Sequence, residues 1–186
     1  EAGNSAGKRI KAARMRLEVS DNATEQDFPF YPITMDVNLM DKATKERDDV
    51  GDIILLCAEV ERRSGYKCGM VVVDTLSTTF AGGNENSSED MGTFITNGKT
   101  IQYNGDVSVE LIHHSGKDQA AGARGHSSLR AATDTELEVT AEKFGNKWQR
   151  EIIVKKQRDG ETGARIKFGL NTVAVGKDED NDEITS

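Results

Sequence analysis

Two short apolar runs in this sequence each end in side chains that could do chemistry. The run MVVVD ends in Asp74, and the run VSVELIHH ends in His113 and His114. A carboxylate at the end of a buried strand can orient a magnesium ion beside a nucleotide, directly or through water. A neutral imidazole at the same edge can sense a terminal phosphate or position a water molecule. The alternatives are a turn or helix cap for Asp74 and a hydrogen-bonded structural role for each histidine.

The adjacency of the two histidines limits what they can bind. Successive residues of a strand point to opposite faces, so His113 and His114 cannot readily share one metal ion. We therefore expect one of them to face the core and the other to face a ligand at the edge.

A pair of cations follows later, in KQRDGETG, where Lys156 and Arg158 are two residues apart on one side of a predicted strand. This arrangement suits a polyanion such as a phosphate chain. The alternative is a solvated edge strand whose charges prevent aggregation.

The elements that must position these residues alternate between helix and strand. Residues 1–20 predict a basic amphipathic helix, and residues 48–65 predict a second helix that ends at Gly65. A third helix is expected after the Ser87–Ser88–Asp90 capping pattern, and a short fourth one over residues 127–134. A weak alternation over residues 33–39 suggests a further strand.

Three consecutive valines before Asp74 predict a strand buried on both faces, as in a central parallel sheet. From Thr135 onward, alternating strands and glycine-rich turns predict an antiparallel meander, and residues 176–186 predict a loose acidic tail. The expected fold is a three-layer α/β sandwich with a mostly parallel central sheet and an antiparallel extension. Ligands of such sheets bind beyond the carboxyl ends of the strands, where Asp74 and the histidines lie.

Composition excludes several classes of protein. The 186 residues suffice for one domain, 30% of them are charged, and the net charge is −8, which argues against a generally basic nucleic-acid surface. No apolar run is long enough to span a membrane, and the start of the chain has no secretory signal, so we expect a soluble cytoplasmic protein. Cys57 and Cys68 are expected to be reduced packing residues.

The order of these motifs resembles the RecA-like cores of hexameric replicative helicases, with the plasmid and phage RepA-like ATPases as nearest relatives and DnaB and KaiC in the wider group. The resemblance covers nearly the whole chain. It is carried above all by VVVDTLSTTFAGGNENSSEDMGTFI and HHSGKDQAAGARGHSSLRAA. It implies an ATP-hydrolysing, magnesium-dependent motor that forms a homo-oligomer, expected to be a hexamer, and holds single-stranded DNA in central loops.

The resemblance also assigns roles near the nucleotide. Asp74 is similar to the magnesium-orienting carboxylate of the Walker B strand, and Thr75 beside it is implied to contact the nucleotide. The histidine pair resembles the sensor of the γ-phosphate, with His114 favoured over His113. Glu1 matches the position of the catalytic glutamate that polarises the attacking water.

Cations complete the implied site. Lys156 and Arg158 resemble a K-x-R pair that reaches the nucleotide of a neighbouring subunit as an arginine finger in trans. Lys117, Arg124 and Arg130 match a segment near the subunit interface or the central channel.

One departure from the family pattern is serious. The sequence contains no G-x-x-x-x-G-K-[ST] loop, and Gly98-Lys99-Thr100 lacks the first glycine at the required spacing and follows a helical pattern rather than a strand. We therefore expect residues 1–186 to be a partial core without its first strand and phosphate loop, with no ATP turnover of its own. Two rivals stay open: a non-catalytic RecA-fold module for oligomerisation or partner binding, and a KaiC-like regulatory ATPase.

Overall fold

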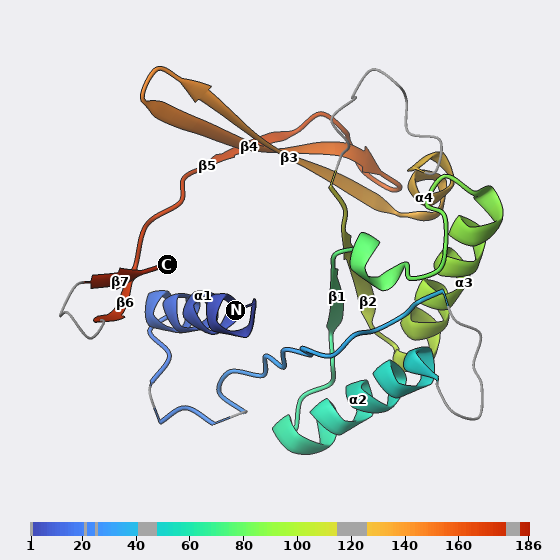
Figure 1. Ribbon diagram of the computed structural model, residues 1–186, viewed down its shortest axis with the longest axis horizontal. Coiled ribbons are helices and arrows are strands. Elements are labelled where there is room, and N and C mark those ends of the chain that lie inside the picture. Colours follow the sequence, from blue (N-terminus) through green and yellow to red (C-terminus); the bar gives the residue numbers. More distant parts are fainter. Residues whose placement is uncertain (1, 21, 25, 41–47, 115–125, 178–182) are drawn as a thin grey trace. The chain divides into compact units, whose positions relative to one another are not determined.

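In the computed structural model the chain forms two compact units (Figure 1). The structure describes residues 2–20, 22–24, 26–40, 48–114, 126–177 and 183–186. Residues 22–132 make the first unit, called here the α/β unit. Residues 1–21 and 133–186 make the second, called here the strand-rich unit. None of the described helices is both long enough and apolar enough to cross a membrane.

The described residues of the α/β unit form a two-stranded parallel sheet and three α-helices. Strands β1 (Met70–Asp74) and β2 (Ser108–Ile112) pair in parallel, with Met70 opposite Ser108 and Asp74 opposite Ile112. The helices are α2 (Asp49–Ser64), α3 (Ser88–Gly105) and α4 (His126–Ala132), and a short 3-10 turn, η1 (Ser77–Thr79), follows β1.

Helix α2 begins and ends where the sequence predicts, and helix α3 begins at its predicted cap. The Asp48 side chain accepts a hydrogen bond from the Gly51 amide at the start of α2, and Gly65 ends that helix in the left-handed conformation that glycine adopts without strain. The Ser87 hydroxyl accepts from the Asp90 amide at the start of α3. These caps satisfy backbone groups that have no partner within the helix.

One hydrophobic core holds the α/β unit together. It lies between the helices, the segment around Leu39 and one face of the sheet, and its largest fully buried side chains include Phe94, Leu39, Leu76 and Ile101. Phe80 and Phe94 pack at a ring-centroid distance of 5.2 Å.

Within the described residues, the sheet of the α/β unit packs against the core on one face only, which corrects the prediction of a buried central strand. Val73 is 7% exposed and faces the core, whereas its neighbour Val72 is 54% exposed on the other face. The described residues thus form a mixed α/β fold with one small parallel sheet, not the expected three-layer sandwich. An apolar run indicates that a strand can be buried on both faces. It does not indicate whether the fold supplies a layer on each face.

The strand-rich unit contains α1 (Ala2–Arg16) and two antiparallel sheets. Strands β3 (Thr135–Phe144), β4 (Lys147–Gln157) and β5 (Arg165–Phe168) form the predicted meander, with β4 in the centre. Strands β6 (Ala174–Lys177) and β7 (Glu183–Thr185) form a separate hairpin.

Two further predictions are wrong. Residues 183–185 pair with β6, so the acidic tail is not loose there. Residues 33–39 form no strand. Individual hydrogen bonds hold this segment in place, and no ladder of backbone hydrogen bonds pairs it with a neighbouring strand. The Asp49 carboxylate accepts from the Asn38 amide at 2.6 Å, and the Leu39 amide donates to the Thr79 carbonyl at 2.8 Å.

Both cysteines are free, in agreement with the sequence prediction. Cys57 is buried in α2, and Cys68 is partly exposed just before β1. Burial, together with the neighbouring Cys68 thiol, raises the pKa of Cys57 to about 11, so this thiol stays protonated at neutral pH.

Candidate active site at the carboxyl edge of the parallel sheet

The parallel pairing brings Asp74 and the two histidines to one edge of the sheet. Asp74 is the last residue of β1 and pairs with Ile112, the last residue of β2, and His113 and His114 follow directly. The sequence predicted this common edge from the assumption of parallel strands, and the register bears that assumption out.

The edge is held in place by the core beneath it. The Leu76 amide donates to the Ile112 carbonyl at 2.9 Å, which continues the link between the two strands past Asp74. Leu76 and Val73 on either side of Asp74 are buried, so the carboxylate is carried by a backbone that is anchored before and after it.

The turn after Asp74 is fixed by its own hydroxyl groups. The peptide bond between Asp74 and Thr75 is cis. The Thr75 amide donates to the Thr78 hydroxyl at 3.0 Å, and that hydroxyl donates to the Thr75 carbonyl at 2.8 Å. The Asp74 side chain is exposed, and no residue in the described ranges forms a hydrogen bond or ion pair with it.

The two histidines differ in exposure, as their alternation predicts. His113 is partly buried and His114 is exposed. His114 therefore has the access to a ligand that the sequence assigned to one member of the pair.

Sequence reasoning missed a second carboxylate near this turn. The Ser77 hydroxyl, in η1, donates to Glu85 at 2.6 Å, so Glu85 is tied to the turn that follows Asp74. Glu85 lies within VVVDTLSTTFAGGNENSSEDMGTFI, which carries the family resemblance, and no local pattern distinguishes it from the other acids there.

The edge fits a magnesium ion held mainly by a nucleotide and water. Such an ion commonly takes one or two protein carboxylates and completes its shell with phosphate oxygens and water. Asp74 supplies one unpaired carboxylate, and within the described ranges no cluster of three or more His, Cys, Asp or Glu residues could hold a metal by itself.

Gly98, Lys99 and Thr100 do not form a phosphate loop, as the sequence predicted. They lie inside helix α3, where backbone amides are engaged in helical hydrogen bonds and cannot cradle a phosphate.

Lys156 and Arg158 belong to the strand-rich unit and are engaged with the start of β3. The Lys156 ammonium donates to the Thr133 carbonyl at 2.6 Å, and Arg158 forms an ion pair with Asp134 at 2.7 Å. The Arg158 amide also donates to the Asp134 carbonyl at 2.9 Å. The alternative of a solvated edge strand is confirmed only in part. Strand β4 lies in the centre of the sheet, between β3 and β5, but β5 pairs only with its residues Arg150–Ile153.

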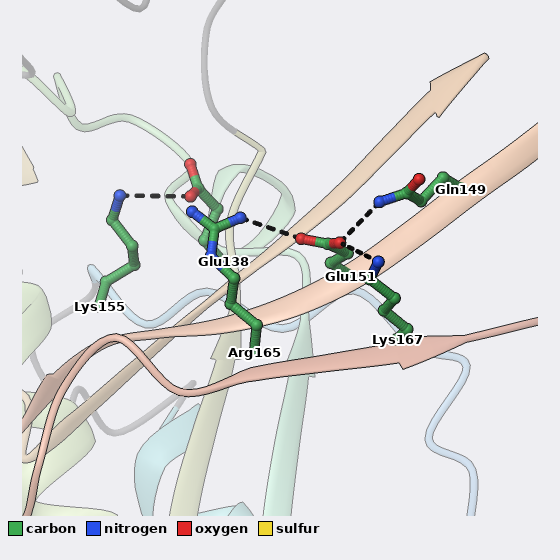
Figure 2. A network of polar contacts seen from close by, with 6 residues as sticks. All are labelled: Glu138, Gln149, Glu151, Lys155, Arg165 and Lys167. Carbon is green, nitrogen blue, oxygen red and sulfur yellow. Dashed lines mark hydrogen bonds and ion pairs between the residues drawn. The ribbon is translucent and has the colours of Figure 1, made fainter. Parts of the chain in front are cut away.

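Figure 2 shows how the charges of this sheet are paired. Glu151 is 8% exposed and accepts from Gln149 at 2.7 Å and from Arg165 at 3.0 Å, with Lys167 at 3.7 Å. These contacts, that with Gln149 first, hold the pKa of Glu151 below its ordinary value. Lys155 pairs with Glu138 at 3.3 Å.

The remaining predicted residues are placed only in part. Arg130 lies in α4 with its side chain exposed. Glu1, Lys117 and Arg124 lie outside the described residues, so the structure does not test where they sit.

The pocket found in the described part of the chain is away from Asp74. It has a volume of about 490 Å³ and lies at the start of the two parallel strands, lined by residues 67–69, 102–103 and 106–108. Lys67 and Asp106 form an ion pair at its wall. Since Asp74 ends β1 and this pocket surrounds its beginning, the pocket is not part of the candidate site.

Comparison with known proteins adds one finding. A family model described as an AAA domain matches residues 1–120, which is more than half of the chain and includes β1, β2 and both histidines. No curated protein matches the sequence.

Proposed function

The chain belongs to the AAA domain family, and on that premise we propose that it is the ATP-hydrolysing motor domain of a RepA-type replicative DNA helicase. AAA domains as a family are ATPases that bind ATP and Mg²⁺. The observation that carries the proposal is the common edge of Asp74, a carboxylate with no partner among the described residues, and His114, an exposed imidazole.

The residues at this edge would divide the work of phosphoryl transfer. Magnesium bound there supplies charge neutralisation for the phosphate oxygens. Asp74 would hold the ion or one of its water ligands, and Thr75 would lie against the nucleotide. His114 would sense the terminal phosphate, with His113 supporting its position. Glu1 would accept a proton from the attacking water.

The trans-acting cations would complete the site in an assembly. Arg158, with Lys156, would reach the nucleotide of the next subunit in a hexamer. For this Arg158 must exchange Asp134 for a phosphate, and the exposure of that ion pair in solvent makes the exchange inexpensive. Three further cations would lie near the subunit interface or near a central channel for single-stranded DNA: Lys117, Arg124 and Arg130. The protein would act in the cytoplasm.

The test compares two carboxylates of the same sheet in the natural protein that contains this chain. Asp74→Ala should reduce magnesium-dependent ATP hydrolysis and strand displacement by at least about a hundredfold, because charge stabilisation at the transferred phosphate is lost. Glu110→Ala is the matched control, since Glu110 is exposed in the middle of β2. Both variants should keep the wild-type free energy of unfolding to within about 0.5 kcal/mol.

Hydrolysis that survives Asp74→Ala, or that falls equally in Glu110→Ala, would contradict the proposal. Residues 1–186 by themselves should show no turnover, because the sequence contains no phosphate loop.

A second candidate is a non-catalytic module of the same family, favoured by the helical setting of Gly98–Thr100. Equilibrium binding of ATP to the natural protein separates the two, since the module needs none.

A further inference from the structure

The tip of the β3–β4 hairpin combines exposed aromatic rings with cations. Gly145 and Asn146 form its two-residue turn, and Gly145 has a φ of 60°, a conformation that glycine adopts readily. Phe144 and Lys147 face each other across the turn, and Lys143 faces Trp148. Phe144 is 60% exposed and Trp148 is 54% exposed, so neither ring serves a core.

The cations of the tip differ from four other cations in or beside the sheet. Lys155, Arg158, Arg165 and Lys167 all have carboxylate partners. Lys143, Lys147 and Arg150 have no ion pair with any residue in the described ranges.

Local charge is therefore reversed at the tip. Residues 141–150 contain three cations and one carboxylate, Glu142, for a net charge of +2, in a chain whose net charge is −8. Glu142 pairs with Gln149 in the strand register and so lies on the opposite face from Lys143 and Trp148. The face that carries Trp148 thus has positive charge without a neighbouring acid.

The ring of Trp148 is also coupled to a cation. The Arg150 guanidinium lies 5.5 Å from the centre of the ring, within the range of a cation–π contact. Register places Arg150 beside Ala141, so a small side chain leaves this side of the ring open. An exposed planar ring flanked by unpaired cations suits a ligand with flat apolar groups joined by phosphates.

We propose that the β3–β4 hairpin tip binds single-stranded nucleic acid, with a base stacked on Trp148 and the phosphates contacted by Lys143 and Arg150. Unpaired bases expose the flat faces that stacking needs, whereas a duplex hides them. The inference rests on the proposed function for the identity of the strand as DNA.

Intrinsic fluorescence gives a direct test, because Trp148 is the single tryptophan of the chain. Titration of the 186-residue chain with an oligodeoxythymidylate, without nucleotide or magnesium, should quench that fluorescence. Two phosphate contacts predict a slope of about −1.4 in log K against log salt. A fourfold rise in salt should therefore weaken binding by about 7-fold.

Anisotropy of a labelled oligonucleotide then separates the parts of the site. Trp148→Ala should weaken binding by about 5–150-fold, and Trp148→Phe should restore most of it, because a ring still stacks. Arg150→Ala should reduce the salt slope by about 0.7. The matched controls are Tyr103→Ala, an exposed aromatic on α3, and Lys167→Ala, a cation of β5 paired with Glu151. Both should bind as the wild type does.

Several outcomes would overturn the proposal: no binding, binding without quenching, equal affinity for a duplex of the same length, or full affinity in both Trp148→Ala and Arg150→Ala. Self-association that Trp148→Ala abolishes, without any oligonucleotide binding, would assign the tip to a protein interface instead. The assay contains no ATP, so its failure leaves the ATPase proposal standing, and that proposal fails only on the Asp74 test.

Discussion

The two units of this protein use apolar and charged residues in opposite ways. The α/β unit buries a cluster of aliphatic and aromatic side chains and leaves Asp74 and His114 exposed at its edge. The described part of the strand-rich unit buries Ala12, Val175 and the carboxylate Glu151, while Leu137, Val139 and Ile166 are exposed on its sheet. Internal stability therefore explains neither the exposed carboxylate of Asp74 on the first unit nor the exposed apolar side chains on the sheet of the second unit.

The largest effect should come from Arg158, a cation of the strand-rich unit whose ion pair with Asp134 suggests a purely structural role. In the natural protein, Arg158→Ala should reduce ATP turnover by about 10³–10⁵ while nucleotide affinity hardly changes, because a trans finger acts mainly on the transition state. Arg165→Ala is the control, an arginine of the same sheet that pairs with Glu151.

Mixed assemblies sharpen this experiment. Arg158→Ala subunits doped with Asp74→Ala subunits should recover part of the activity, since each supplies what the other lacks at some interfaces. Full turnover in Arg158→Ala, or loss without complementation, would return Arg158 to a structural role and make Lys156 the next residue to test.

A smaller effect should distinguish the two faces of β1. Val73→Ala should lower the free energy of unfolding by about 2 kcal/mol, because it removes methyl groups from a packed core. Val72→Ala, one residue away on the exposed face, should change it by less than about 0.5 kcal/mol. Denaturant unfolding of both variants is the measurement, and a comparable loss at Val72 would mean that another surface covers that face.

The smallest effect concerns the pH dependence of the strand-rich unit. Hydrogen bonds from Gln149 and Arg165 lower the pKa of Glu151 from its ordinary value of 4.5, so its contribution to stability is present above pH 4.5 and is lost as the pH falls through the lowered value. Thermal melts should place Glu151→Gln a few degrees below the wild type at pH 7, with the gap closing in acid. Glu161→Gln, at an exposed position, should melt as the wild type at every pH. A gap that persists at low pH would rule out this linkage.

The sequence predicted the elements whose signals are local. Gly65 ends α2 and Ser87 begins α3 because capping depends on a few neighbouring residues. The common edge of Asp74 and the histidines also followed, since parallel strands bring their carboxyl ends together.

Features that depend on distant parts of the chain could not be predicted. The exposure of Val72 depends on whether a second layer covers the sheet, which an apolar run does not encode. The contacts of Lys156 and Arg158 with Thr133 and Asp134 depend on a register shift between Glu136 and Leu137. The hairpin cations form no ion pair with a described residue, and this depends on which face of the strands each side chain occupies. The sequence analysis did not single out the turn that sets those faces.

The split composition of the strand-rich unit has a consequence for synthesis on the ribosome. Helix α1 contacts β6, yet about 160 residues separate them in the sequence. At about 5–20 residues per second, α1 leaves the ribosome some 8–30 s before its partner strand exists. During that interval the intervening α/β unit can fold as a complete stretch of chain, while the basic helix waits as a nascent segment open to chaperones.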